Sequence, residues 1–81
     1  MKTVEISPKE YWKRMNYYDA ILYCQLLNID GREDWRMPSE KETPRGYTFK
    51  WTVEDADCHE EIKKGGAWWI IPVRDISVYY L

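Results

Sequence analysis

The sequence has little of what membrane proteins, nucleic-acid-binding proteins and disulfide-rich proteins require. It holds only two cysteines, neither in a C-x-x-C pair, which argues against a disulfide framework or a thiolate metal cluster. No apolar run approaches the ~18 residues of a membrane span. Twelve basic residues stand against fourteen acidic ones, and the net charge of -2 creates no field that attracts nucleic acid or an anionic membrane.

Residues suited to catalysis are also sparse. His59 is the only histidine, and the sequence has no nucleophile elbow and no glycine-rich phosphate loop. With Asp55 and Asp57, His59 lies in an acidic stretch that fits neither the H-E-x-x-H zinc motif nor an EF-hand loop. We interpret this stretch as a solvated charged loop, with a divalent-cation site as the alternative. The sequence therefore predicts a protein without enzymatic activity, bound metal or cofactor.

The chain of 81 residues is too short for two cores of normal size, so we predict a single domain over 1–81. Its first residues lack the apolar run of a signal peptide. We therefore expect a cytoplasmic protein in which both thiols, Cys24 and Cys58, are reduced.

Large aromatic residues are what the sequence has in abundance: five Trp, seven Tyr and one Phe. One large ring buries about 150 to 250 Å², so a few of them can build the core of a small domain. The same side chains anchor protein interfaces. Because these rings outnumber what so short a chain can hide, we expect some of them to form a binding surface.

Periodicity predicts one helix and several strands. The helix spans 17–28, with Asn16 as its N-cap and Gly31 as its terminator. At most one or two helical turns fit over 40–47, and residues 11–15 fit either an extended piece or a helical turn. The predicted strands cover 2–6, 47–53, an apolar stretch over 67–73 broken at Pro72, and a last strand through Ile76, Val78 and Tyr80.

The predicted helix has two apolar faces. The first is expected to pack on a sheet and consists of Tyr17, Ala20, Ile21, Cys24 and Leu27. The second consists of Tyr18, Leu22 and Leu26, which a solvated helix would not need. This second face must be covered either by the chain's own N-terminal or C-terminal segment or by a partner.

Two blocks of the sequence stand in a recognisable order. The first reads Tyr17-Tyr18-Asp19-Ala20-Ile21-Leu22-Tyr23-Cys24 and is followed, after Gly31, by Asp34-Trp35-Arg36-Met37-Pro38-Ser39. The second consists of Phe49-Lys50-Trp51-Thr52 and Pro72-Val73-Arg74. Together they resemble the bacterial and phage domain family typified by the C-terminal domain of the Lcl collagen-like adhesin. Members of that family read aromatic, D-A-x-x-Y-C, a gap with glycine, D-W-R-L-P-T, then a Y-W-[ST]-[ST] strand and a V-R strand.

The resemblance implies an α+β, reduced C-type-lectin-like fold. Such a fold has a small, twisted, mainly antiparallel sheet with one main helix packed on it, binds ligands or partners through its loops and seldom catalyses. The second helix of the family is reduced here to a turn, because Ser39-Glu40-Lys41-Glu42 runs straight into Thr43-Pro44.

The most specific motif is interpreted as structural; it comprises Asp34, Trp35 and Arg36, with Arg74 as a later counterpart. Trp35 would fill the junction between helix and sheet, and Arg36 would form a charged fork to a carboxylate or to loop carbonyls. Arg74 would bridge in a similar way near the sheet. The carboxylates expected to pair with Arg36 are Asp34, Asp19 and Glu40.

The functional prediction concerns exposed apolar side chains. Trp68 and Trp69 point to opposite faces of a strand, so at most one of them lines the core. We predict a small non-enzymatic binding protein, of the phage or bacterial accessory kind, that binds a protein partner or another copy of itself, but neither nucleic acid nor a membrane. The predicted partner-binding residues are Tyr18, Leu22, Leu26, Trp68, Trp69 and Tyr79. The alternative is a carbohydrate or small-ligand module using Trp51, Asp55, Asp57 and His59.

Overall fold

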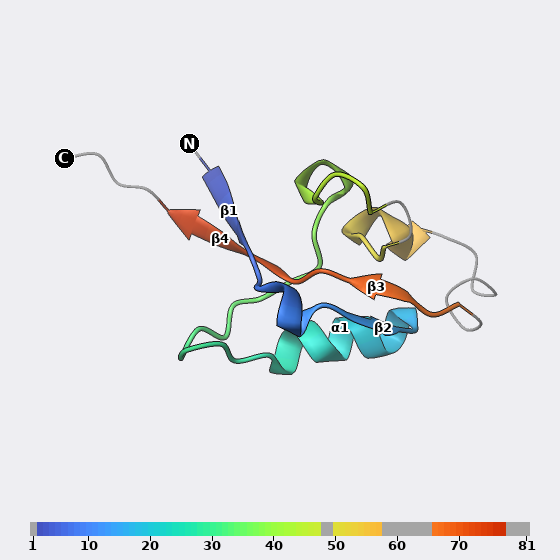
Figure 1. Cartoon of the computed structure of the whole chain (residues 1–81), viewed down its shortest axis with the longest axis horizontal. Coiled ribbons are helices and arrows are strands. Elements are labelled where there is room, and N and C mark those ends of the chain that lie inside the picture. Colours follow the sequence, from blue (N-terminus) through green and yellow to red (C-terminus); the bar gives the residue numbers. More distant parts are fainter. Residues whose placement is uncertain (1, 48–49, 58–65, 78–81) are drawn as a thin grey trace.

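The computed structural model describes residues 2–47, 50–57 and 66–77, and over these residues the chain is an α+β protein (Figure 1). One α-helix and two two-stranded antiparallel sheets are present in that part of the chain. The elements in order are β1 (Lys2–Ile6), η1 (Lys9–Tyr11), β2 (Lys13–Met15), α1 (Tyr17–Leu26), η2 (Glu40–Glu42), η3 (Val53–Asp57), β3 (Trp68–Ile70) and β4 (Val73–Ser77), where η denotes a 3-10 helix. The predicted α+β class and its one main helix are confirmed, but in place of one small sheet the described residues form two separate two-stranded antiparallel sheets.

The N-terminal segment runs antiparallel to the C-terminal strands in two steps. β1 pairs with β4, and β2 pairs with β3. Between the steps the Ser7 backbone N–H donates to the Pro72 carbonyl at 3.0 Å, and η1 bulges out after Pro8. Prolines have no N–H for a ladder, so the two sheets separate where Pro8 and Pro72 fall. In Figure 1, β1 and β4 extend together away from α1.

These strands confirm most of the predicted elements. The strand over 2–6 forms as expected, and the apolar stretch 67–73 is divided into β3 and β4 at Pro72. The open alternatives for 11–15 are both partly realised, because a 3-10 turn ends at Tyr11 and β2 follows. Predicted strand residues Val78 and Tyr80 lie outside the described residues.

Helix α1 begins where the sequence predicts and ends earlier. The Asn16 side chain caps it by accepting the Asp19 backbone N–H at 2.8 Å. The helix ends at Leu26 because Leu27 already has the extended values φ −69 and ψ 128. Gly31 is therefore not the helix terminator. With Asp30 it occupies a tight two-residue turn, both at positive φ (53 and 84), which is the conformation that an Asp-Gly pair favours.

The predicted strand over 47–53 is wrong in its described part. Lys50 makes one isolated bridge to Trp69, and no strand follows it in residues 50–53. The backbone N–H and the hydroxyl of Thr52 both donate to the Asp55 carboxylate, and the Asp55 backbone N–H donates to the Thr52 carbonyl. This local capping starts η3 at Val53, and the competition from side-chain hydrogen bonds overrides the alternating pattern. Residues 48–49 lie outside the described residues.

The core lies on the inner face of α1 and contains two adjacent clusters. The larger one consists of Tyr17, Ala20, Cys24, Met37, Trp51 and Ile70. The smaller one consists of Leu27, Ile29 and Trp35, and Tyr23 packs against both. The face predicted to pack on a sheet is thus confirmed: Tyr17, Ala20, Cys24 and Leu27 are buried, and Ile21 packs against them.

Trp51 is the centre of the larger cluster and is completely buried. Its ring stacks on Trp68 with centroids 4.7 Å apart and meets Tyr17 edge-on at 5.4 Å. Its indole N–H donates to the Met15 carbonyl at 2.7 Å. This hydrogen bond satisfies the buried polar edge of the ring and also fixes β2 beside the core.

Candidate interaction surface

The outer face of α1 is an exposed apolar stripe. It consists of Tyr18, Leu22 and Leu26, which are 50%, 52% and 74% exposed. Within the described residues, neither the N-terminal nor the C-terminal segment covers this stripe, and residues 78–81 lie outside the described residues. Leu22 and Leu26 are four positions apart and hence neighbours on one helix face, so their exposure is contiguous. Scattered exposed leucines are ordinary, but a contiguous apolar patch is typical of an interaction site.

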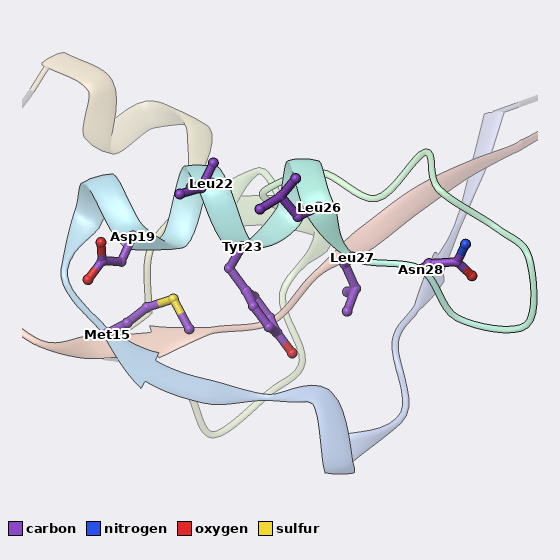
Figure 2. A pocket seen from close by; sticks show the side chains of 7 residues that line it. All are labelled: Met15, Asp19, Leu22, Tyr23, Leu26, Leu27 and Asn28. Carbon is purple, nitrogen blue, oxygen red and sulfur yellow. The ribbon is translucent and has the colours of Figure 1, made fainter.

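A groove of about 400 Å³ lies beside the outer stripe, between α1 and β2 (Figure 2). Its lining residues are Met15, Asp19, Leu22, Tyr23, Leu26, Leu27 and Asn28. In Figure 2 the side chains of Tyr23 and Leu27 extend from the α1 side toward the N-terminal segment, while Leu22 and Leu26 lie along the helix. Met15 enters from β2, so the groove combines two elements that pack side by side.

The floor of this groove is held by hydrogen bonds. The Tyr23 hydroxyl donates to the Tyr11 carbonyl at 2.7 Å, which ties the helix to the end of η1. Burial raises the pKa of Tyr23, and Cys24 and Tyr11 raise it further, so the phenol is a neutral donor at physiological pH. On the opposite wall the Met15 carbonyl accepts the Trp51 indole N–H. The groove is therefore preformed.

The groove offers little for chemistry. Among the described residues that line it, Asp19 is the only charged one. Cys24 lies on the inner face, 2% exposed and free of any disulfide, and burial raises the pKa of its thiol to about 12. A thiol with such a pKa stays protonated and unreactive at neutral pH. The arrangement suits apolar binding.

The two tryptophans of β3 point to opposite faces, as predicted. Trp68 is half-buried against Trp51, whereas Trp69 is 37% exposed and pairs across the sheet with Arg14. Neither lines the groove beside α1. The structure therefore brings Tyr18, Leu22 and Leu26 together but places the β3 tryptophans elsewhere, and the predicted Tyr79 lies outside the described residues.

The Asp34-Trp35-Arg36 motif is built into the fold. Trp35 is 5% exposed, packs with Leu27 and Ile29, and donates its indole N–H to the Arg32 carbonyl at 3.0 Å. It fills the space at the end of α1 in the smaller cluster, in agreement with its predicted structural role.

Arg36 does form the predicted charged fork, but with different carboxylates, and it also donates to a loop carbonyl, that of Met37, at 3.0 Å. Its guanidinium donates to both oxygens of Glu42 (3.0 and 2.9 Å) and to both oxygens of Asp75 (3.2 and 2.9 Å). The expected partners Asp34, Asp19 and Glu40 are not used. The missed partner Glu42 belongs to a capping box with Ser39, and the Ser39-x-x-Glu42 spacing was the signal that could have found it.

Arg74 bridges two elements as predicted. It pairs with Asp34 at 2.8 Å and with Glu5 of β1 at 3.2 Å. The hydrogen bond from Arg36 lowers the pKa of Glu42 to about 2, and the one from Arg74 lowers the pKa of Asp34. These two arginines join β1 and β4 to the segment 34–42, so their carboxylates are structural.

Of the residues of the alternative ligand site, only Trp51 and Asp55 have described side chains. Trp51 is 0% exposed and offers no surface to a ligand. Asp55 lines a smaller hollow of about 180 Å³ beside Trp68, but its carboxylate is engaged by Thr52. Asp57 closes η3, and His59 lies outside the described residues.

In residues 2–47, 50–57 and 66–77, no group of three or more His, Cys, Asp or Glu side chains could hold a metal ion. No helix in that part of the chain has the length and apolar character needed to cross a bilayer.

The fold and the groove define a small α+β protein that exposes an apolar helix face beside a preformed hollow. Comparisons of the chain with models of protein families, with curated proteins and with solved structures gave no match. The resemblance to the Lcl C-terminal-domain family, with its C-type-lectin-like fold, therefore stays a prediction from sequence motifs.

Proposed function

We propose that this protein is a non-enzymatic binding protein that docks a protein partner on the outer stripe of α1 and the adjacent groove. The observation that carries the proposal is the exposure of Leu22 and Leu26, 52% and 74%, on a helix whose other face supplies Tyr17, Ala20 and Cys24 to the core. Covering two such leucines contributes about 25 cal/mol per Å² of apolar area removed from water. The stripe is not needed for packing the core, which leaves binding as its use.

The rigidity of the groove supports the same proposal. The Tyr23 side chain is fixed by its hydrogen bond to the Tyr11 carbonyl, so it loses little conformational freedom when a partner arrives, and the backbone of Met15 is held by the Trp51 indole. Preorganised surfaces bind more tightly than flexible ones of equal area because less ordering accompanies association.

The test compares two single lysine substitutions on the same helix. Leu26→Lys places a charge in the outer stripe, and Gln25→Lys adds the same charge at the next position, outside the groove. Both should fold, because Lys is a good helix former and a cation is favoured near a helix C-terminus. Circular dichroism and thermal melts check this.

The measurement is the amount of each protein that is retained by the wild type and by each of the two variants. We expect proteins that are retained by the wild type and by Gln25→Lys but lost with Leu26→Lys, and sedimentation of the purified protein shows whether the partner is a second copy. Identical retention by all three proteins, together with identical sedimentation, would contradict the proposal.

A further inference from the structure

We infer that the groove beside α1 takes an amphipathic helix that carries apolar side chains one turn apart and a basic residue at the end that meets Asp19. This inference rests on the proposed function and narrows the chemistry of the partner. It follows from the size of the stripe, the shape of the groove and the charge on its rim.

The size of the stripe argues against a second copy as the occupant. α1 has ten residues, and a helix of that length is about 15 Å long and 10 Å wide. Two such faces pressed together bury less than the roughly 800 Å² per partner found in stable complexes. A separate helix laid in the groove gains contacts from the α1 wall and the β2 wall together.

The shape of the groove fits one helix. Leu22 and Leu26 form one wall with the spacing of successive helical turns, and Met15 forms the facing wall. Tyr23 lies between them, and Leu27 lies toward the Asn28 end. An incoming helix with apolar residues at i, i+3 or i+4 places its side chains at the same spacing, as in helix-in-groove recognition.

The charge on the rim selects the polar residues of the partner. Asp19 is the sole charged lining residue, and its carboxylate makes no ion pair within the described part of the chain. It lies in the first turn of α1, at one end of the groove. A lysine or arginine of the partner would complement this carboxylate, whereas an acidic residue there would be repelled.

In the experiment, peptides that bind the folded wild-type protein are selected from a displayed library of random 16-residue sequences. We expect a consensus of apolar residues three or four apart with a flanking Lys or Arg. A synthetic consensus peptide is then titrated by fluorescence anisotropy against the wild type, Asp19→Asn, Asp30→Asn and Leu26→Lys. Asp30→Asn is the matched control, since it removes the same charge at an exposed turn outside the groove and Asn tolerates the positive φ there.

Asp19→Asn should weaken binding about two- to fivefold and flatten its salt dependence, as for an exposed ion pair. Asp30→Asn should leave both unchanged, and Leu26→Lys should weaken binding at least about tenfold, because it buries a charge in an apolar contact.

Several results would overturn the inference while leaving the proposed function intact. These are an acidic or non-helical consensus that still depends on Leu26, equal effects of Asp19→Asn and Asp30→Asn, or dimerisation of the wild type that Leu26→Lys abolishes. A selection that yields only peptides insensitive to Leu26→Lys would overturn both.

Discussion

The two faces of α1 are both apolar, yet they differ sharply in burial. On the inner face Tyr17, Ala20 and Cys24 are 6%, 0% and 2% exposed, whereas on the outer face Leu22 and Leu26 are 52% and 74% exposed. Leucine is more hydrophobic than the tyrosine, alanine and cysteine of the inner face, so hydrophobicity alone does not decide which face is covered. The inner face is covered because Trp51, Met37 and Ile70 are brought against it from distant segments of the chain.

This difference separates folding from binding on a single helix. Residues of the inner face stabilise the fold, and their loss should be seen in the free energy of unfolding. Residues of the outer stripe contribute little to that free energy, so their substitution should affect only what docks there.

The largest expected effect comes from removing the centre of the inner cluster. Trp51→Ala should lower the free energy of unfolding by about 3 to 5 kcal/mol, because it leaves a large cavity between Tyr17 and Trp68 and frees the Met15 carbonyl. That loss approaches the whole stability of a small domain. Urea denaturation followed by circular dichroism measures the change.

Leu26→Ala is the matched truncation on the outer face. It should change the free energy of unfolding by no more than about 0.5 kcal/mol, since Leu26 is 74% exposed and Ala is the best helix former. If the two truncations were equally damaging, the distinction between the faces would be lost.

An intermediate change in the free energy of unfolding is expected from the Arg36–Glu42 ion pair, which fixes the segment that packs against the inner face of α1. Arg36 directly precedes Met37 of the larger cluster, and its fork to Glu42 fixes this segment. The pKa of Glu42 is about 2 in the folded protein against an ordinary value of 4.5. Because the folded pKa is lowered, the stabilisation is complete above about pH 4.5 and is lost as the pH falls toward 2.

Glu42→Gln should therefore lower the free energy of unfolding by about 1 to 2 kcal/mol at pH 7 and remove much of its decline in acid. Urea midpoints at pH 7, 5 and 3 test this. Glu40→Gln, in the same 3-10 turn but with its side chain outside the fork, should keep the wild-type pH profile. Parallel profiles for wild type and Glu42→Gln would show that the fork contributes nothing to the acid response.

The elements that could be predicted from the sequence are those specified locally. The Asn16 cap and the inner face of α1 are encoded within one helix, and the opposite orientations of Trp68 and Trp69 follow from strand geometry alone. The strand predicted over 47–53 failed because alternation was weighed without the capping hydrogen bonds between Thr52 and Asp55.

Of the candidate site, the outer stripe could be predicted from the sequence, but the groove beside it could not. The outer stripe follows from helical periodicity, but the groove needs Met15, which is positioned by the pairing of β2 with β3 near the other end of the chain. One partner of Arg36 was missed for the same reason, since Asp75 is 39 residues away. Contacts of this kind depend on topology, which a single sequence does not display. The other partner, Glu42, is only six residues away, and its capping-box spacing with Ser39 is present in the sequence.

The smallest change in stability is expected from a thiol placed on the outer face, and it gives the most direct comparison of the two faces. In a Cys58→Ser background, Cys24 should react with a disulfide reagent only through opening of the fold, because it is buried and its pKa is raised to about 12. Leu26→Cys in the same background adds a second thiol at a position that is 74% exposed in the wild type.

We expect one thiol equivalent to react rapidly and the other at least about a hundredfold more slowly, with a free energy of unfolding within about 0.5 kcal/mol of the background. In denaturing urea both should react at similar rates, which controls for intrinsic reactivity. Equal rates under native conditions would mean that the inner face of α1 opens as readily as the outer stripe, and the assignment of one face to the fold and the other to a partner could not stand.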